Sequence, residues 1–110
     1  MTDRELLELA AKAAGMKDGT WFDGYNDEGS DTGDYWNPLT DDGDALRLAV
    51  KLWLAVWTAV DNGRPPMYAL ALGGGYPNTI RAEELHNTDP YAATRRAIVR
   101  AAAEIGRGAP

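Results

Sequence analysis

Apolar residues near the N-terminus recur at the spacing of one helix face. In the segment RELLELAAKAAG they return every three or four positions, which is typical of an amphipathic helix. Thr2 followed three residues later by Glu5 is a capping-box pattern, and Gly15 suits the end of a helix. The pattern predicts a helix over 3–14.

A second helical pattern lies near the C-terminus, in the segment DPYAATRRAIVRAAAEIGRG. Asp89 suits the N-cap and Pro90 the first helical position. Gly106 suits the C-terminal stop. The expected apolar face consists of Tyr91, Ile98, Ala102 and Ile105.

The segment TDDGDALRLAVKL predicts a helix in the middle of the chain. Thr40 or Asp41 can accept hydrogen bonds from its first N–H groups, and Asp42 and Asp44 follow near the positive end of its dipole. We therefore expect these acids to cap the helix. Its predicted apolar face consists of Leu46, Ala49, Val50 and Trp53.

Shorter apolar runs predict strands. Residues Thr20–Tyr25 are rich in residues that favour β structure. The run Trp53–Val60 could prolong the middle helix, but its β-branched and aromatic residues favour a strand, and Asp61–Gly63 is a turn signal. Met67–Leu72 then forms the second strand of an antiparallel hairpin. We expect a short helical turn at Arg81–Leu85.

The expected element order is α-β-α-β-β-α. A small antiparallel sheet with helices packed on it buries the apolar face of each element. The sequence thus predicts an α+β fold of the α-β-α sandwich type. The 110 residues contain no repeat or linker, and we expect a single domain over 1–110.

Composition and charge exclude several classes of protein. The chain has no cysteine, and therefore no disulfide or thiolate site. Its net charge of −6 argues against direct binding to nucleic acid or to an anionic membrane, because both need a positive surface. The run Leu52–Val60 is too short to span a bilayer, and acids at Asp3 and Glu5 are unlike a signal peptide. We expect a cytoplasmic protein.

The segment from Asp18 through Asp44 contains nine acids and no lysine or arginine. Their spacing fails the calcium-loop pattern, because Tyr25 and Glu28 stand where an oxygen ligand and a glycine belong. We expect no metal site, and solvation and helix capping account for the acids. An acidic surface over Asp23–Asp44 that imitates nucleic-acid phosphates is the open alternative, since it would attract a basic partner.

Groups for catalysis are scarce. Ser30 is the only serine and His86 the only histidine, so a Ser–His–Asp site would need these two residues to meet. The segment GGGYPN lacks the lysine and the hydroxyl residue of a phosphate-binding loop. We expect no catalytic residues and no cofactor, and so a protein that is not an enzyme.

Tryptophan, tyrosine and arginine are the candidate binding residues. Four tryptophans and five tyrosines stand against one phenylalanine, and these rings favour interfaces and stacking on flat ligands. On a strand, Trp53 and Trp57 would share a face, either in the core, in a homo-oligomer contact or as a ligand platform. Arginine forks suit phosphate, although many arginines are solvated or paired with acids. The candidate ligand-binding residues are Tyr35, Trp36, Trp57, Arg64, Tyr76, Arg95 and Arg96.

Two segments, WNPLTDDGDALRLAVKL (Trp36–Leu52) and DPYAATRRAIVRAAAEIG (Asp89–Gly106), resemble a family of small bacteriophage and prophage proteins, the phage ABA sandwich domain. With RELLELAAKAAG, the resemblance covers most of the expected helices. It implies an α-β-α layered fold and an origin in a phage genome. It carries no catalytic residues that could be transferred to this chain.

Small phage proteins without catalytic groups often act by binding. The first hypothesis is a non-enzymatic protein that counters bacterial immunity in the host cytoplasm by sequestering a small nucleotide-like signal. A Trp or Tyr ring would stack on the base and an arginine would pair with phosphate, in a pocket between the subunits of a homo-oligomer. The alternative is an acidic protein inhibitor of a nucleic-acid-binding host defence complex. A hydrolase of the same signal would need a metal or a base, which the sequence does not offer.

Overall fold

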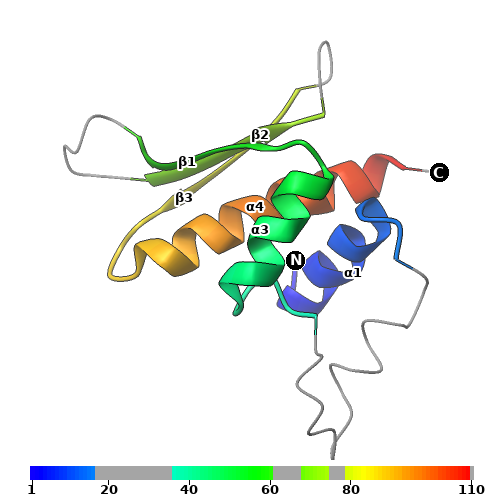
Figure 1. Cartoon of the computed structure of the whole chain (residues 1–110), viewed down its shortest axis with the longest axis horizontal. Coiled ribbons are helices and arrows are strands. Elements are labelled where there is room, and N and C mark those ends of the chain that lie inside the picture. Colours follow the sequence, from blue (N-terminus) through cyan, green and yellow to red (C-terminus); the bar gives the residue numbers. More distant parts are fainter. Residues whose placement is uncertain (17–35, 61–67, 75–78, 110) are drawn as a thin grey trace, which may run out of the picture.

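The computed structural model describes residues 1–16, 36–60, 68–74 and 79–109. Its elements are, in chain order, α1 (Asp3–Ala13), α3 (Asp42–Lys51), β1 (Ala55–Val60), β2 (Tyr68–Gly73), β3 (Ile80–Leu85) and α4 (Pro90–Gly108) (Figure 1). The predicted α+β class, a small antiparallel sheet with helices packed on it, is confirmed. The strand predicted at Thr20–Tyr25 lies outside the described residues.

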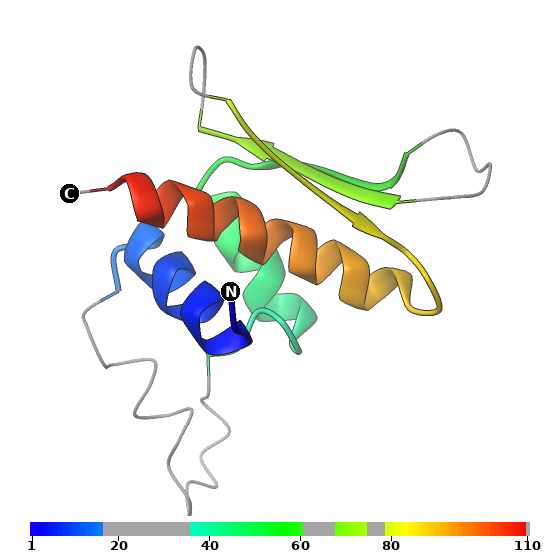
Figure 2. The same ribbon diagram turned by 180° about the vertical axis from the view of Figure 1, so that it is seen from behind.

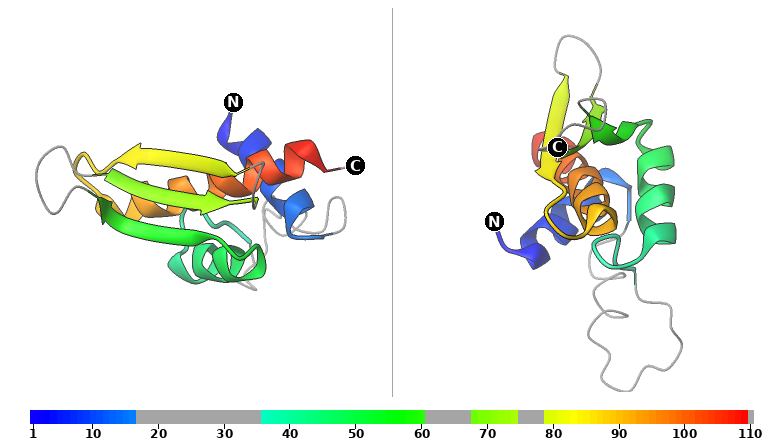
Figure 3. Two further views of the ribbon diagram at one scale, coloured as in Figure 1. Left: turned by 90° about the horizontal axis from the view of Figure 1, so that it is seen from above. Right: turned by 90° about the vertical axis from the view of Figure 1, so that its left-hand side faces the viewer.

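Helix α4 is the centre of the described fold, because it contacts the sheet and both other helices. The sheet lies on one side of α4, and α1 packs on the side away from the sheet (Figure 2). Helix α3 lies beside α4, next to the sheet edge formed by β1 (Figure 3). The three described helices thus all lie on one side of the sheet. None of them combines the length and the apolar character needed to cross a bilayer.

The caps predicted for the helices are present. Thr2 and Glu5 form the capping box of α1, with the Thr2 hydroxyl accepting from the Glu5 N–H at 3.1 Å and the Thr2 N–H donating to Glu5 Oε1 at 3.0 Å. Asp41, rather than Thr40, caps α3 by accepting from the backbone N–H of Asp44 at 2.8 Å. The Asp89 carboxylate caps α4 in the same way. These caps explain where the helices start.

The sheet has the order β1-β2-β3 with antiparallel neighbours. The predicted hairpin of β1 and β2 is confirmed, with Trp57 opposite Leu70, and its register shifts between Trp57 and Val60. The first strand begins later than predicted. Trp53 lies between α3 and β1, and therefore does not share a strand face with Trp57.

Strand β3 occupies the segment Arg81–Leu85, for which a helical turn was expected. That prediction is wrong because sheet pairing and packing override the helix propensity of Ala, Glu and Leu. Each residue of β3 pairs with β2. Ala82 is buried against α4, and the carboxylate of Glu84, on the same strand face, accepts from Arg100 of α4. The strand therefore gains tertiary contacts that a helical turn would lack.

Alanine fills the contact between the sheet and α4. Six buried alanines form this layer, three from the strands and three from the helix, and several are completely buried. Side chains this small let the helix backbone lie close to the sheet, so a larger side chain here would overpack the contact. The six residues are Ala69, Ala71, Ala82, Ala93, Ala97 and Ala101.

The second part of the core lies between α1, α3 and α4. It is centred on Leu6, Leu48, Ile98 and Val99, with small alanines between them. The apolar face predicted for α3 is largely wrong. Of its members only Ala49 is buried, whereas Leu46, Val50 and Trp53 are exposed. The row that faces the core is Ala45, Leu48, Ala49 and Leu52.

Gly106 lies inside α4 and not at its end. The predicted stop at this glycine is wrong, because α4 continues to Gly108. A Cβ at position 106 would stand 1.9 Å from the carbonyl oxygen of Leu9 in α1 and 2.8 Å from the carbonyl carbon. Gly106 therefore allows α4 and α1 to approach to backbone contact.

Candidate ligand groove

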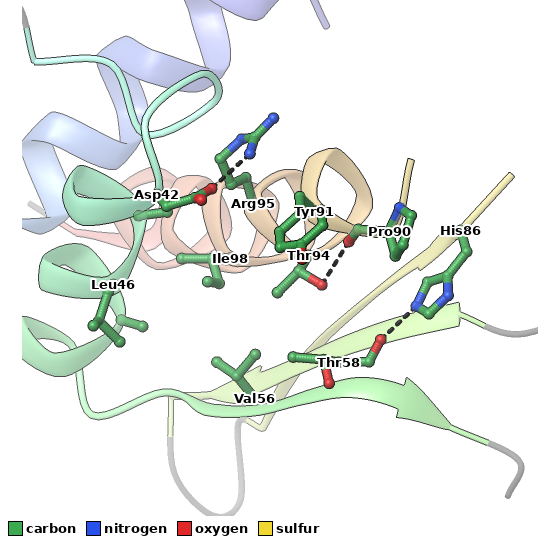
Figure 4. A pocket seen from close by; sticks show the side chains of 12 residues that line it. Asp42, Leu46, Val56, Thr58, His86, Pro90, Tyr91, Thr94, Arg95 and Ile98 are labelled. Carbon is green, nitrogen blue, oxygen red and sulfur yellow. Dashed lines mark hydrogen bonds and ion pairs between the residues drawn. The ribbon is translucent and has the colours of Figure 1, made fainter. Parts of the chain in front are cut away.

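A groove of about 600 Å³ lies between β1, α3 and α4 (Figure 4). Its volume is in the range of small-molecule binding sites. The middle of the groove is apolar and is lined by Ala45, Ala49, Val56 and Ile98. Polar side chains stand at its two ends. An apolar middle with a few polar groups is typical of sites that hold a small, partly flat ligand.

Arg95 and Asp42 form one end of the groove. The Nη1 atom of Arg95 donates to Asp42 Oδ1 at 2.6 Å, and its Nε atom donates to the carbonyl oxygen of Leu39 at 2.8 Å. The side chain of Arg95 is only 17% exposed, while that of Asp42 is 70% exposed. Arg95 is thus held by the backbone before α3, whereas its carboxylate partner stands largely in water.

His86 and Thr58 form the other end. The Nε2 atom of His86 bonds the carbonyl oxygen of Thr58 on β1. Because a carbonyl only accepts, Nε2 of His86 is the donor of this bond, and Nδ1 faces no partner from Thr58. Tyr91, at the start of α4, lines the groove with its side chain 70% exposed. Figure 4 shows its ring on the α4 wall, across from the β1 wall.

The acids at the start of α3 hold the local structure together. Asp41 caps the helix, and Asp44 accepts from the N–H of Asn37 at 2.9 Å and from Arg47 at 2.8 Å. The carbonyl oxygen of Asn37 in turn accepts from the N–H of Asp41 at 2.9 Å. The predicted capping role of these acids is therefore confirmed, and the same contacts fix Asp42 beside Arg95.

A second cavity, of about 330 Å³, lies between α1, β3 and α4. Three arginines line it: Arg81, Arg96 and Arg100. Each has a carboxylate partner. Arg96 pairs with Asp3 at 3.0 Å, Arg81 with Glu83 at 2.6 Å, and Arg100 with Glu84.

The structure separates the ligand residues proposed from the sequence. Arg95 lines the groove, but its neighbour Arg96 lines the second cavity. Trp36 packs against the core clusters around α1 and α3. Trp57 is 47% exposed and points away from the groove, because the β1 residues that line it are Val56 and Thr58. Three further candidates, Tyr35, Arg64 and Tyr76, lie outside the described residues.

Three groove residues were not predicted from the sequence, namely Tyr91, Thr58 and His86. A signal for Tyr91 was present, since it lies four residues before Arg95 and seven before Ile98, on one helix face. No comparable signal existed for Thr58 and His86, which are 28 residues apart and meet only through the fold.

Among the described residues, no three His, Cys, Asp or Glu side chains form a group that could hold a metal ion. Comparisons of the chain with family models, curated proteins and solved structures found no match. The resemblance to the phage ABA sandwich domain therefore stays a prediction from the quoted segments.

Proposed function

We propose that this chain is a non-enzymatic phage protein that binds and sequesters a small nucleotide-like signal of bacterial immunity in the host cytoplasm. The observation that carries the proposal is the groove between β1, α3 and α4, with an apolar middle and Arg95 at one end. The sequence hypothesis of a homo-oligomer is part of the same proposal.

The middle of the groove suits a nucleobase. Val56 and Ile98 offer apolar contact to a flat ring, and the exposed ring of Tyr91 can stack on it, a contact typically worth about 1–3 kcal/mol per base. The hydroxyl of Thr58 and Nδ1 of His86 offer hydrogen bonds to the polar edge of the base. Such groups fix the orientation of a ligand that the apolar contacts retain.

The Arg95 end suits a phosphate. A phosphate oxygen would replace the Asp42 carboxylate on Nη1, while Nε keeps its bond to Leu39. The exchange costs little, because ion pairs with a water-exposed partner contribute only about 0–1 kcal/mol. The N-terminus of α3 lies nearby and favours negative charge. Asp42 is then a competitor that the phosphate must displace.

The test is ligand capture followed by analysis of what is released. The protein is incubated with cyclic dinucleotides and with cyclic ADP-ribose isomers, separated from free ligand and denatured. Recovery of the intact nucleotide is expected. A chemically altered nucleotide would indicate an enzyme, and no uptake from the whole panel would overturn the proposal.

Matched arginine variants locate the site. Arg95→Ala is expected to reduce uptake at least tenfold, whereas Arg96→Ala, in the second cavity, is expected to keep it. The reverse result would move the site to the second cavity. Thermal melting of both variants shows whether the fold is retained.

The alternative hypothesis, an acidic inhibitor of a host defence complex, rests on the net charge of −6 and on the segment Asp23–Asp44. Within the described part of this segment, Asp41, Asp42 and Asp44 are engaged in caps and ion pairs. No nucleotide uptake, together with salt-sensitive binding to a basic protein, would favour this alternative.

A further inference from the structure

Helix α3 carries a row of apolar side chains that the described fold does not cover. Leu46, Val50 and Trp53 are 64%, 68% and 89% exposed. Leu46 and Val50 are four residues apart and lie in one row of α3, and Trp53 follows three residues later, just beyond the end of the helix. The core-facing row of α3 lies on another side of the helix. We call Leu46, Val50 and Trp53 the α3 face.

Trp53 stands in a backbone conformation that tryptophan rarely adopts. Its φ is +58°, in the left-handed region where a side chain costs about 1–2 kcal/mol. The position follows the end of α3, where Trp53 N–H bonds the carbonyl oxygen of Val50 at 3.2 Å and Leu54 N–H bonds that of Ala49 at 2.9 Å. Glycine is the usual residue there. A strained and exposed ring gains little burial from the described part of the chain to offset this cost, which indicates a use outside it.

The spacing of the α3 face fits a second copy of the same chain. Val50 lies near the middle of the row, with Leu46 four residues before it and Trp53 three residues after it. Two antiparallel α3 helices related by a two-fold axis at Val50 bring Leu46 of each copy against Trp53 of the other. Each contact then occurs twice, as a symmetric interface requires.

The α3 face exposes much of the apolar area that such a dimer needs. An aromatic side chain offers about 150–250 Å², so Trp53, which is 89% exposed, leaves roughly 130–220 Å² of ring surface in water. Leu46 and Val50 extend this surface. A standard interface buries about 800 Å² per partner, of which a little over half is apolar. The α3 face can supply much of that apolar share.

The pairing also bears on the groove, because Leu46 belongs both to the α3 face and to the groove lining. A Trp53 ring placed against Leu46 lies at the mouth of the groove, opposite Tyr91. We propose that the chain forms a two-fold dimer through its α3 faces, in which Trp53 of the second copy closes the groove over its ligand. The closing role rests on the proposed ligand-binding function; the dimer itself does not.

The dimer is tested by sedimentation of the full chain. Wild type is expected at twice its mass of 11.9 kDa, and Val50→Asp, which places two carboxylates at the axis, is expected to be monomeric. Leu85→Asp is the matched control, since Leu85 is also an exposed leucine, 53% exposed on β3 and away from α3, and it should remain a dimer. A monomeric wild type, or a dimer that survives Val50→Asp, would overturn the proposal.

A single thiol provides a second readout. The chain has no cysteine, so Val50→Cys can form a disulfide only with another copy. Mild oxidation is expected to give a covalent dimer, whereas Leu85→Cys should not. Unlike Val50→Asp, Val50→Cys adds no charge. Failure to cross-link would therefore indicate that the interface is absent, and not that a new charge unfolded the chain.

Closure of the groove by Trp53 is tested separately, by measuring nucleotide binding. Trp53→Ala and Val50→Asp are both expected to weaken binding of the captured nucleotide about tenfold, the effect of removing a central aromatic contact. If the monomeric variant binds as tightly as the dimer, Trp53 does not close the groove, although the proposed function stands. If no nucleotide is captured while the disulfide dimer forms, the proposed function fails and the interface stands.

Discussion

Gly15 and Trp53 occupy the same position of the same backbone motif in two different helices. Gly15 follows the end of α1 with φ +77°, and Trp53 follows the end of α3 with φ +58°. In both places the N–H of this residue and the N–H of the residue after it bond back to helix carbonyls in the pattern of a Schellman motif. The smallest residue and the largest thus serve one turn geometry, and only the glycine does so without strain.

Replacing Trp53 by glycine is therefore expected to stabilise the chain. Trp53→Gly should raise the free energy of unfolding by about 1 kcal/mol, because it removes a Cβ from the left-handed region and gives up little burial. Denaturant unfolding in the monomeric Val50→Asp background measures this effect without a contribution from association.

Two variants control for the backbone explanation. Trp53→Ala removes the ring but keeps the Cβ, and its stability should change by less than about 0.5 kcal/mol. Gly15→Ala should lose about 1 kcal/mol, although an added Cβ there meets nothing within 4 Å. If Trp53→Gly is less stable than Trp53→Ala, the ring is held by contacts within the chain and strain is the wrong account.

Gly106→Ala is expected to be strongly destabilising. The new Cβ would overlap the backbone of Leu9, which cannot rotate aside as a side chain can. Helix α1 would have to move away from α4, and overpacking of this kind costs about 1–3 kcal/mol or more. Thermal melting should show the loss as a lower Tm.

Gly108→Ala is the matched control for this prediction. It lies in the same helix two residues later, and an added Cβ meets nothing within 4 Å. Its Tm should stay the same or rise slightly, because alanine favours the helix more than glycine does. Equal losses at both positions would mean that helix propensity, and not the contact with Leu9, decides the result.

Helix starts were predictable because they depend on residues close in sequence. Thr2 with Glu5, Asp41 and Asp89 cap the helices as expected. The hairpin of β1 and β2 also followed from local composition. Each cap joins residues three positions apart, and the hairpin joins two strands that follow one another in the sequence.

The remaining fold depended on contacts between distant segments. Helix α3 has two apolar rows, and only the position of α4 decides that Leu48 is buried and Val50 is not. Strand β3 looks helical until β2 pairs with it. From the sequence alone, Gly106 looks like the end of a helix. The close approach of α1 explains why a glycine lies inside the helix instead.

The candidate site was predictable only in part, for the same reason. Arg95 was proposed for its guanidinium and does line the groove. Arg96 was proposed together with Arg95. Adjacent residues of a helix point about 100° apart, however, so the two arginines reach different cavities. Arg95 pairs with Asp42, which lies 53 positions earlier in the sequence. The sequence spacing of these residues gave no sign of this contact.

Glu5 is expected to titrate below its ordinary range. Hydrogen bonds from the Thr2 backbone and then from its hydroxyl, together with the nearby N-terminal charge, hold the pKa of Glu5 below 4.5. The contribution to stability is present above the unfolded pKa of 4.5 and is lost as the pH falls through the lower folded value. Carboxyl NMR titration of folded chain measures this pKa.

Thr2 variants test the cause of that shift. Thr2→Ser keeps the backbone N–H and the hydroxyl, and the pKa should stay low. Thr2→Pro fits the φ of −75° at this position but removes both groups, and the pKa should return toward 4.5. A low pKa in Thr2→Pro would assign the shift to the N-terminal charge instead.

Asp42 and Arg95 should have opposite effects on nucleotide binding. Asp42→Asn removes the charge that competes with a phosphate for Arg95 Nη1, so binding should tighten several-fold, while stability changes by less than about 0.5 kcal/mol for this exposed pair. Arg95→Ala should weaken binding at least tenfold and cost about 1.5 kcal/mol of stability, because the carbonyl of Leu39 loses its donor. Isothermal titration with the captured nucleotide measures binding by both variants. Weaker binding by Asp42→Asn would show that Asp42 contacts the ligand itself, and would place the phosphate away from this end of the groove.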